Sequence, residues 1–359
     1  MSAAFPRGPA TTAVGSVVGY LRTRGVIADG SDRSGETGAL VTPLTGGVSG
    51  DAVLVEVGAQ RVVVKRALER LLVQDEWWAK PERAVTEAAA IEVLHRLTPD
   101  ETPELLDVDP GRFTLVMSAA DALWVPWKTR LMNNPLDPVV ESSVARTLGT
   151  VLGTWHRATA SSRDLAARFD DYEAFEQLRV GPFHRTVARR HPRVAAAITT
   201  CIDDLERRRD CLIHGDYSPK NVLVSPAGPP GTASRDALMV LDFEVACYGA
   251  AVFDIAYMQC HLILKAVHRP DQRAVFRSVA RTLLDAYVEV TAAESGPRLG
   301  WHTACLLLAR IDGTSPAGYL DERAQDLVRD MALRLLAEDE PAIDQLWDHA
   351  DELIARGPR

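Results

Sequence analysis

Two short apolar runs, each followed by polar residues, constrain the fold of this chain more than any other feature. The first leads from Cys211 into His-Gly-Asp216, after which a polar loop ends at Asn221. The second, Leu238-Met-Val-Leu241, is followed directly by Asp242. Apolar runs of this length between turn residues are typical of buried strands. The pattern predicts two adjacent strands whose polar ends meet at one place.

These polar groups suit the transfer of a phosphoryl group from a magnesium-bound nucleotide. The protein has little covalent chemistry to do in that reaction, so the site mainly positions an acceptor hydroxyl and holds metal against the phosphates. Asp216 is the predicted catalytic residue, because a carboxylate can orient or deprotonate the hydroxyl. Asn221, Asp242 and Glu244 are the predicted ligands of Mg²⁺, which prefers hard oxygen atoms. The expected cofactors are therefore ATP and Mg²⁺.

A lysine and a glutamate in the first third of the chain extend this pattern. Lys65 closes the apolar run 62–64, where its ammonium group needs a partner or access to water. Glu87 lies on the apolar face of a helix predicted over residues 82–97, where an unpaired carboxylate would be costly to bury. A lysine that simply reaches solvent at a strand edge is the alternative. We expect an ion pair of Lys65 with Glu87, rather than with Glu92, that holds the nucleotide phosphates.

Residues 44–50, Leu-Thr-Gly-Gly-Val-Ser-Gly, form a glycine-rich turn between two predicted strands. Glycine lets backbone amides approach phosphate oxygens closely. Such turns are more often structural. Phosphate binding by this turn is therefore supported only by the residues that follow it in the sequence. The residues predicted to bind the nucleotide are Gly46, Gly47, Ser49, Gly50, Lys65, Glu87, Met117 and Lys220, of which Lys220 would touch the γ-phosphate.

The distribution of apolar residues predicts an α+β protein with two lobes. Residues 1–38 are rich in Gly, Pro, Ser, Thr and Ala, and we expect a partly ordered extension with a short helix at 14–21. Residues 39–118 carry β-branched runs and predict a small, strand-rich, nucleotide-binding lobe. Residues 119–359 show mostly helical spacing and predict a larger lobe that binds the acceptor and carries the catalytic residue.

Composition and charge exclude several other classes of protein. The formal net charge is -9, whereas a protein that grips nucleic acid through its phosphates favours a basic face. The five cysteines include no C-x-x-C pair and indicate reduced, buried thiols. No apolar run has the roughly 18 residues of a membrane helix, and the N-terminus lacks the pattern of a signal peptide. We expect a cytoplasmic protein without nucleic-acid or membrane partners.

The catalytic segments resemble those of the aminoglycoside phosphotransferase-like small-molecule kinases, over roughly residues 40 to 340. His214-Gly-Asp216 with Asn221, and Leu241-Asp-Phe-Glu244, match the two catalytic signatures of that family. Lys65 and Glu87 match its ion pair. The resemblance implies a bilobal protein-kinase-like fold, with a small β-rich N-lobe and a larger, mainly helical C-lobe.

Within this family the chain is most similar to the methylthioribose kinase-like branch, which implies a homodimer. The similar segments are residues 64–68, 83–94, 244–249 and 253–255. Two differences from that branch leave the sugar open: the stretch 217–220 differs, and Phe243 replaces a proline.

The resemblance implies an acceptor pocket between the catalytic loop and the C-terminal helices. Trp127, Tyr217, Tyr248 and Arg310 are the candidate acceptor-binding residues, and an ion pair of Arg310 with Asp312 is the structural alternative for that arginine. The chain also enters a helix-like segment soon after Asp242, which leaves no room for an activation loop. A protein substrate is therefore not expected.

Other polar residues of this region are assigned structural roles. We expect His214 to hold the catalytic loop through hydrogen bonds and Asp254 to brace it. His156, His261 and His302 have no recognisable partners in the sequence and are expected to be core or surface residues.

Three functions remain open from the sequence. The main prediction is an ATP-dependent phosphotransferase that moves the γ-phosphoryl group to a hydroxyl of a small, polar, sugar-like metabolite. An aminoglycoside-type antibiotic kinase is favoured by the excess of acidic over basic residues from Arg310 onward. A catalytically silent nucleotide-binding protein of the same fold is disfavoured, because every expected polar residue is present.

Overall fold

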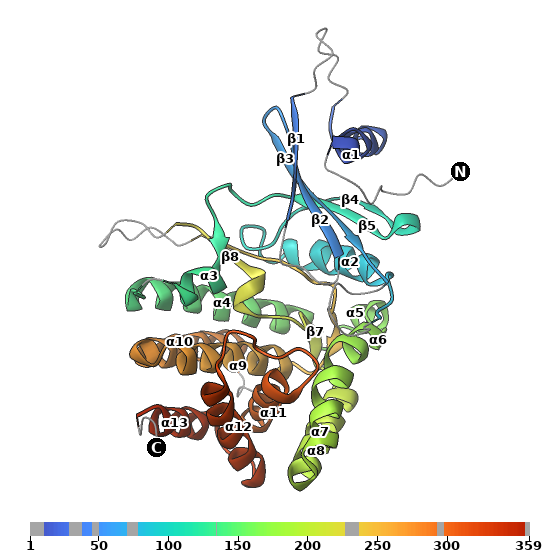
Figure 1. Cartoon of the computed structure of the whole chain (residues 1–359). Coiled ribbons are helices and arrows are strands. Elements are labelled where there is room, and N and C mark those ends of the chain that lie inside the picture. Colours follow the sequence, from blue (N-terminus) through green and yellow to red (C-terminus); the bar gives the residue numbers. More distant parts are fainter. Residues whose placement is uncertain are drawn as a thin grey trace. The chain divides into compact units, whose positions relative to one another are not determined.

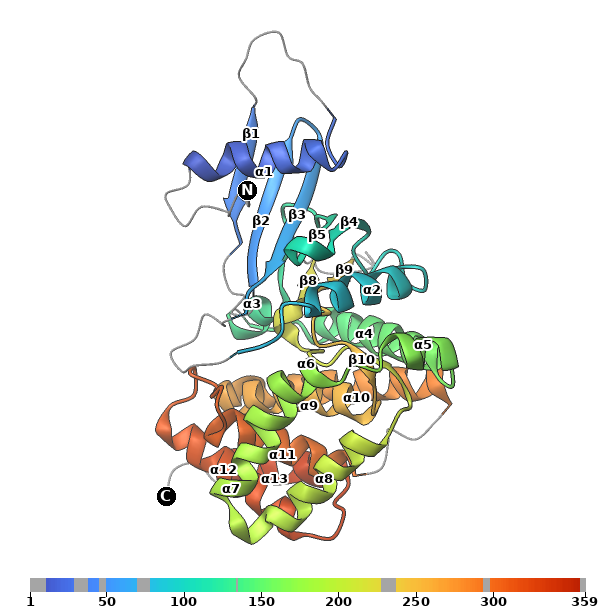
Figure 2. The same cartoon turned by 90° about the vertical axis from the view of Figure 1, so that its right-hand side faces the viewer.

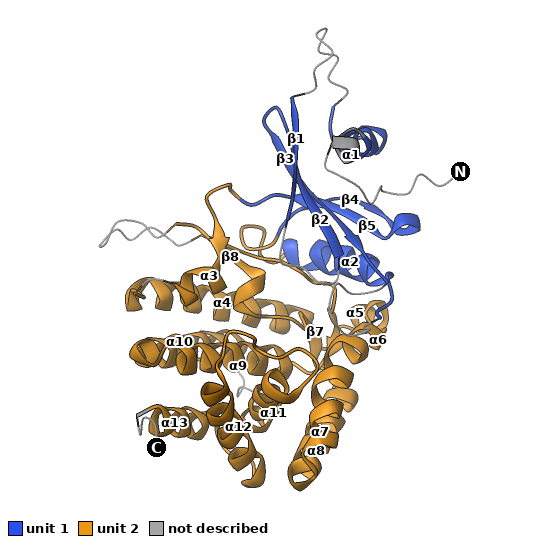
Figure 3. Ribbon diagram, viewed as in Figure 1, with its two compact units in different colours: residues 1–95, 103–120 blue, residues 96–102, 121–359 orange. Residues whose placement is uncertain are grey.

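The computed structural model describes residues 11–28, 38–44, 50–69, 78–133, 135–226, 237–292 and 298–355 (Figure 1). The chain divides into two compact units (Figure 3). The first unit contains residues 1–95 and 103–120, and the second contains residues 96–102 and 121–359. Residues 96–102, which the sequence analysis placed in the N-lobe, thus belong to the second unit.

An antiparallel sheet of five strands forms the centre of the first unit. Its strand order is β1 (Ala39–Pro43), β2 (Gly50–Val57), β3 (Gln60–Ala67), β5 (Thr114–Ser118) and β4 (Leu105–Asp109), with the short turn η1 (Pro110–Arg112) between β4 and β5. β2 and β3 form a tight hairpin, in which Val57 of β2 pairs with Gln60 of β3. Gly58 makes this tight turn with a φ of 59°, a conformation that glycine adopts without steric cost.

Helices cover both faces of this sheet. Val62 and Val64 of β3 contact α1 (Thr11–Thr23), whereas Lys65 bonds to Glu87 of α2 (Arg83–His95). Neighbouring residues of a strand point to opposite faces, so α1 and α2 pack on opposite sides of the sheet. The helix predicted over residues 82–97 is therefore confirmed and packs on the sheet as its apolar stripe requires.

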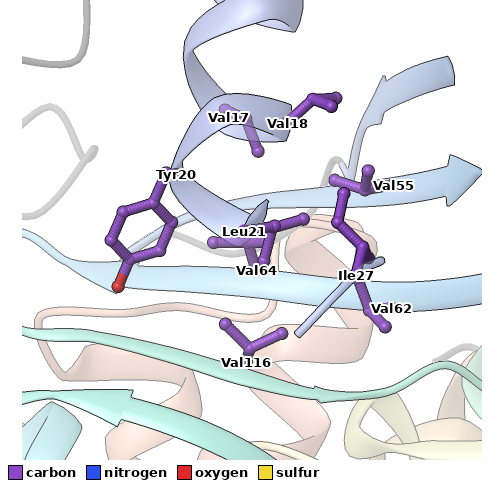
Figure 4. Close-up of a cluster of buried hydrophobic side chains, with 9 residues drawn as sticks. All are labelled: Val17, Val18, Tyr20, Leu21, Ile27, Val55, Val62, Val64 and Val116. Atoms are coloured by element: carbon purple, nitrogen blue, oxygen red, sulfur yellow. The ribbon is translucent and has the colours of Figure 1, made fainter. Parts of the chain in front are cut away.

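The helix α1 is an integral part of the first unit. Figure 2 shows it lying across β1, β2 and β3. Its side chains Val17, Val18 and Leu21 are buried in a cluster with residues from three strands (Figure 4), namely Val55, Val62, Val64 and Val116. Residues 1–38 were predicted to be a partly ordered extension with a short helix at 14–21; the helix is present, and it supplies one layer of the core.

The second unit is built mainly from helices. Its two longest helices, α4 and α10, pack so closely that a small residue is needed at their contact. A Cβ on Gly149 of α4 would lie 2.2 Å from the carbonyl oxygen of Leu283 of α10. In Figure 1, α4, α10 and α9 lie side by side. The helices and helical turns are α3 (Trp127–Met132), α4 (Pro138–Thr159), α5 (Arg163–Arg168), α6 (Glu173–Phe175), η2 (Glu176–Arg185), α7 (Thr186–Arg190), η3 (Pro192–Val194), α8 (Ala195–Arg207), η4 (Pro219–Asn221), α9 (Val252–His268), η5 (Pro270–Gln272), α10 (Arg273–Thr291), α11 (Leu299–Asp312), α12 (Glu322–Ala337) and α13 (Ile343–Ala355).

Five short strands flank the segments that contain Asp216, Asn221, Asp242 and Glu244. β7 (Cys211–Ile213) pairs with β10 (Cys247–Gly249), and β8 (Val222–Val224) lies between β6 (Val125–Pro126) and β9 (Leu238–Val240). β9, which precedes Asp242, thus pairs with β8, which follows the catalytic loop. It does not pair with β7, which precedes that loop. The two sets of polar residues still meet, because the loop connects both pairs of strands.

Two absences bear on the expectations from composition. All five cysteines are buried and free of disulfides. Among the helices that the structure describes, none combines the length and apolarity needed to cross a bilayer.

Candidate active site

The loop that follows β7 is fixed at its start by one buried carboxylate. Asp254, in the first turn of α9, accepts the backbone N–H groups of His214 at Oδ2 (2.7 Å) and of Gly215 at Oδ1 (2.8 Å). The sequence analysis predicted this bracing role, and it is confirmed. His156 also has partners that its sequence context did not indicate: Nε2 lies 3.2 Å from Asp254 Oδ2, and Nδ1 lies 3.0 Å from the Tyr287 hydroxyl.

Gly215 adopts a conformation that admits only glycine at this point of the loop. Its φ is 75°, in the left-handed region. A Cβ here would lie 2.6 Å from the carbonyl oxygen of Val245, a distance at which backbone would have to move. The glycine thus sets the direction in which the chain delivers Asp216.

His214 connects the catalytic loop to the segment that carries Asp242. Its Nδ1 accepts the backbone N–H of Asp216 (3.1 Å), so the ring proton is on Nε2, which donates to the carbonyl oxygen of Leu241 (3.1 Å). Burial lowers the pKa of His214 below its usual value, which keeps the ring neutral near pH 7. His214 therefore has the structural role that was predicted for it.

Asp216 is buried and surrounded by donors. Its Oδ1 lies 2.9 Å from Arg179 Nη2, and its Oδ2 lies 2.9 Å from Lys220 Nζ and 2.8 Å from Asn221 Nδ2. Burial alone would raise the pKa of Asp216, but the charges of Arg179 and Lys220 outweigh it and hold the pKa below its usual value. The carboxylate is therefore ionised at neutral pH, which suits the orientation of a hydroxyl better than strong general-base catalysis.

Arg179, in η2, is a site residue that the sequence analysis missed. Its Nε donates to the carbonyl oxygen of Gly215 (2.7 Å), and its guanidinium lies 5.5 Å from the ring centroid of Tyr257 and 5.7 Å from that of Phe183. The side chain is buried and the pKa of Arg179 is raised, because Asp216 and nearby acids outweigh the burial that would lower it. A signal was available, since an arginine inside an apolar stretch needs a partner just as Lys65 does.

Asn221 is oriented by Asp216 and by the neighbouring segment. Its Nδ2 donates to the backbone carbonyl (3.0 Å) and to the carboxylate of Asp216, which leaves the amide oxygen Oδ1 as a potential ligand. The backbone carbonyl of Asn221 accepts the N–H of Leu241 (2.8 Å). This bond and the His214–Leu241 bond hold the loop against the residue that precedes Asp242.

Asp242 has a left-handed backbone with a φ of 72°, which costs a residue other than glycine about 1–3 kcal/mol. Such strain persists only where packing holds the residue, and Phe243 next to it is fully buried against the rings of His214 and Trp155. The negative charge of Asp242 acts on Asp216. A carboxylate held in a strained conformation beside the catalytic loop is typical of a functional site.

The available oxygen donors fit a small, hard cation. Asn221 offers an amide oxygen, and Asp242 and the buried Glu244 offer carboxylates. Mg²⁺ takes such ligands together with waters and phosphate oxygens. These three residues would hold the ion, which would neutralise charge on the nucleotide phosphates.

In the first unit, Lys65 and Glu87 form the predicted ion pair. Lys65 Nζ lies 2.8 Å from Glu87 Oε2 and 2.9 Å from Oε1. The Glu87 side chain is 2% exposed and the Lys65 side chain 13% exposed. Met117 of β5 pairs with Val63, so it shares the sheet face that carries Lys65.

The glycine-rich turn is only partly described. Gly50 is the first residue of β2 and lies opposite Ala67, where a Cβ would come within 2.8 Å of the Arg66 carbonyl oxygen. The other three predicted nucleotide-binding residues of the turn, Gly46, Gly47 and Ser49, lie outside the described residues.

Three of the four predicted acceptor-binding residues have structural roles instead. Trp127 is fully buried, and its Nε1 donates to Glu141 Oε2 (2.7 Å). Tyr217 is also fully buried, and its hydroxyl donates to the carbonyl oxygen of Leu148 (2.8 Å). The hydroxyl of Tyr248 bonds to backbone groups of residues 159 and 162. Their polar atoms complete the core of the second unit, so the acceptor-binding assignments of these three are corrected.

Arg310, the fourth candidate, does not form the ion pair with Asp312 that was its structural alternative. Its guanidinium donates through Nη1 to the carbonyl oxygen and the hydroxyl of Ser315, not to Asp312. Asp312 is instead paired with Arg329 and His191. Arg310 Nε is buried and has no hydrogen-bond partner among the residues that the structure describes.

The sequence of residues 40–290 matches the phosphotransferase enzyme family (APH). The chain belongs to this family. It is accordingly an enzyme, a small-molecule kinase with a protein-kinase-like fold, in which a small antiparallel sheet is combined with many helices.

Individual relatives are distant. Methylthioribose kinase 2 of Oryza sativa subsp. japonica is 23% identical over 269 residues, which cover 66% of this chain and 60% of that protein. A solved structure from Ralstonia eutropha JMP134, assigned as an aminoglycoside phosphotransferase, has a TM-score of 0.52 at 15% identity and covers 94% of this chain and 98% of that one. A microcompartment-associated aminopropanol kinase has a TM-score of 0.48 at 15% identity, covering 93% and 98%. The similarity to the Ralstonia eutropha structure shows the fold alone, and the acceptor stays open.

Proposed function

We propose that this phosphotransferase moves the γ-phosphoryl group of ATP to a hydroxyl of a small, polar, sugar-like metabolite. The observation that carries the proposal is the buried Asp216 carboxylate, which lies within 2.9 Å of Arg179, Lys220 and Asn221. Membership of the phosphotransferase enzyme family supports it. The chain's own residues then divide into those that orient the hydroxyl and those that bind the nucleotide.

Asp216 would accept a hydrogen bond from the incoming hydroxyl and orient its oxygen toward the phosphorus. A low pKa makes this carboxylate a weak base, so most of its contribution comes from positioning and from charge. Positioning is enough for such a reaction when the bond between the γ-phosphorus and the leaving oxygen of ATP is largely broken before the hydroxyl attacks, because the hydroxyl then needs little activation.

Lys220 would serve the transferred phosphoryl group. Its side chain is 44% exposed, although Nζ is bonded to Asp216, so the ammonium can turn toward a ligand. Asp216 and Asp242 outweigh the burial that would lower the pKa of Lys220, so its pKa is raised and the group stays charged. Arg179 has no such freedom, because its guanidinium is committed to Asp216 and to the loop backbone.

Nucleotide-binding roles are proposed for residues of each unit taken by itself. Asn221, Asp242 and Glu244 are proposed to hold Mg²⁺, and Lys65, fixed by Glu87, is proposed to contact the phosphates. The assignments of Gly50 and Met117 remain predictions of the sequence, as do those of Gly46, Gly47 and Ser49, which lie outside the described residues. The homodimer implied by the methylthioribose kinase-like branch also remains a prediction.

An aminoglycoside acceptor is not favoured by the second unit. The excess of acidic residues from Arg310 onward was the reason for considering it, because aminoglycosides are cationic. Many of these acids are bonded to arginines: Asp312 to Arg329, Asp348 and Asp351 to Arg277, Asp330 to Arg334, and Glu340 to Arg298. They therefore do not gather as a free acidic site.

The proposal is tested by measuring ATP consumption against a panel of pentoses, sugar acids, methylthioribose, amino alcohols and aminoglycosides. Asp216→Asn keeps the shape of the side chain and removes its charge, and Asp203→Asn, on the surface of α8, is the matched control. We expect turnover with one acceptor class, lost in Asp216→Asn and kept in Asp203→Asn. Equal turnover in Asp216→Asn would remove the assignment of Asp216.

A further inference from the structure

Three cationic side chains of the second unit gather around one tyrosine. Lys128 Nζ of α3 lies 5.9 Å from the ring centroid of Tyr319, and Lys265 Nζ of α9 lies 6.0 Å from it. Arg310 of α11 adds a third positive charge, which acts on both lysines and on Tyr319. We refer to Lys128, Lys265, Arg310, Tyr319 and His261 as the cation cluster. Lys128 of this cluster is exposed, whereas Lys265 is buried, with an exposed fraction of 1%.

The cation cluster contains buried polar atoms that the protein does not use. Arg310 Nε, His261 Nε2 and the Tyr319 hydroxyl are buried and have no hydrogen-bond partner among the described residues. Lys265 Nζ has one, the carbonyl oxygen of His261 in the preceding helical turn (3.2 Å). A buried polar group without a partner costs stability, so several of them together indicate a site that a ligand completes.

No carboxylate of the described residues forms an ion pair with Lys128, Lys265 or Arg310. Asp312, two residues after Arg310, is bonded to Arg329 and His191. Burial, together with the charges of Lys128 and Arg310, lowers the pKa of Lys265 to about 7. Burial and the charges of Arg310 and Lys220 likewise lower the pKa of Lys128. Uncompensated like charges of this kind are relieved by an anion.

The cation cluster is continuous with the catalytic residue. Tyr257, His261 and Lys265 follow one another at a spacing of four residues, so they share one face of α9. The ring of Tyr257 packs edge-on against His261, with centroids 4.8 Å apart, and lies 5.5 Å from the guanidinium of Arg179, the partner of Asp216. Lys220, the other partner of Asp216, acts electrostatically on Lys128 and on His261.

We propose that the cation cluster binds an anionic group, a carboxylate or a phosphate, of the acceptor whose hydroxyl Asp216 orients. The proposal rests on the proposed function and names the chemical class of its substrate: a small hydroxy acid or a phosphorylated hydroxy compound. Lys128, Lys265 and Arg310 supply charge, and Arg310 Nε and the Tyr319 hydroxyl supply the unused donors. A cationic acceptor such as an amino alcohol would meet repulsion in the same place.

The central variant is Lys265→Met, which keeps an unbranched side chain of similar length and removes a buried charge. Removal of a buried, unpaired charge does not threaten folding. Arg310→Gln is the second variant. Arg281→Gln, on the exposed face of α10, is the matched control, because it also removes one positive charge. Among the described residues, no hydrogen bond or ion pair joins Lys265, Arg310 or Arg281 to Asp216 or to its partners.

The first experiment compares acceptors that differ only in an anionic group: a polyol, the corresponding sugar acid and the corresponding sugar phosphate. We expect kcat/KM of the wild type to favour one of the two anionic acceptors by about tenfold or more, the worth of one charge-assisted hydrogen bond. Lys265→Met and Arg310→Gln should raise KM for that acceptor by a similar factor and leave KM for ATP unchanged. Preference for the acid over the phosphate, or the reverse, identifies the anion.

The second experiment measures binding without turnover, by calorimetric titration of malonate and of inorganic phosphate. Saturable binding in the wild type and in Arg281→Gln that is lost in Lys265→Met supports anion binding by the cation cluster. If such binding is found but no acceptor is phosphorylated, only the proposed function fails. Turnover of the polyol as fast as of the acid, with no effect of Lys265→Met, overturns the cation cluster and leaves the kinase function intact. A rise in KM for ATP in Lys265→Met would also overturn it, because the cluster would then bind the nucleotide.

Discussion

The guanidinium of Arg179 lies 2.9 Å from Oδ1 of Asp216, and the same side chain donates to the carbonyl oxygen of Gly215. One buried arginine thus fixes both the carboxylate that we propose to be catalytic and the backbone turn that delivers it. It also holds the pKa of Asp216 low, together with Lys220. Arg179 is therefore a positioning residue whose effects on geometry and on charge can be separated by experiment.

Replacement of Arg179 by lysine should lower kcat by about a hundredfold, because a single ammonium cannot bond to the carboxylate and to the loop backbone at once. Replacement by methionine removes the charge as well. The pKa of Asp216 should then rise, and the acidic limb of the pH–rate profile should move to higher pH. Arg189→Lys, in α7 of the same unit, is the control.

A purely structural role of Arg179 would give a different pattern. Activity per folded molecule would stay near that of the wild type, and the acidic limb would not move in the methionine variant. Measurement of folded protein by circular dichroism alongside the pH–rate profile distinguishes the two.

The backbone of Asp242 predicts a difference between two substitutions that both remove its carboxylate. Asp242→Ala and Asp242→Gly should each weaken the binding of MgATP, and titrations of ATP with and without Mg²⁺ should become alike. The glycine variant should be more stable than the alanine variant by about 1 kcal/mol, because glycine adopts a φ of 72° without strain. Urea unfolding measures this difference, and equal stabilities would mean that the backbone relaxes when the carboxylate is lost.

Leu21 of α1 predicts that the N-terminal helix stabilises the first unit. The side chain is fully buried among Val62, Val64 and Val116, so Leu21→Ala should lower the free energy of unfolding by about 2–5 kcal/mol. Thr23→Ala, at the exposed end of the helix, should change it by less than about 0.5 kcal/mol. Thermal and urea unfolding of the two variants test this. Similar stabilities would show that α1 is dispensable, as the term extension implied.

Lys265 predicts a pH-dependent stability. Its pKa in the folded protein is lowered to about 7 from the usual 10.5, mainly by burial. Lys128 and Arg310 contribute in the same direction, Cys260 opposes them, and His261 and Tyr319 also face the ammonium. Below the folded pKa the lysine is charged in both states, so the full penalty of burying the charge is present.

As the pH rises from about 7 toward 10.5, folded Lys265 loses its proton while the unfolded chain keeps it, so the penalty is relieved. Lys265→Met should therefore be more stable than the wild type near pH 6, and its advantage should shrink toward pH 10. Urea unfolding across this range, with Arg281→Gln as the control, measures the trend. An advantage that is constant with pH would show that the ammonium is not buried as a charge.

Charged residues beside apolar runs were predictable because burial forces them to find partners. Lys65 and Glu87 were paired on this ground together with the ion pair of kinase-like sites, and the structure has them 2.8 Å apart. Arg179 lies in the π-helix η2, whose side chains do not follow the α-helical period that helix prediction relies on. Its partner Asp216 comes from a distant loop that the local sequence does not indicate.

The aromatic residues near the catalytic loop show where sequence reasoning ended. Trp127, Tyr217 and Tyr248 were predicted to bind the acceptor because the family resemblance implies an acceptor pocket in this region of the chain. Their polar atoms instead bond to Glu141 and to backbone carbonyls inside the core. Which face of a strand or short helix is buried depends on the tertiary packing, and a tyrosine pattern alone does not determine it.

The most direct test of the central claim is phosphorus NMR of the reaction with ATP, Mg²⁺ and the acceptor that is turned over fastest. The account predicts that the γ-phosphoryl group appears as a phosphate ester on a hydroxyl of the acceptor, and that Asp216→Asn binds MgATP but forms the ester at least a thousandfold more slowly, roughly the contribution of a positioned catalytic group. Release of inorganic phosphate without an ester, or an unchanged rate of ester formation in Asp216→Asn, would contradict it.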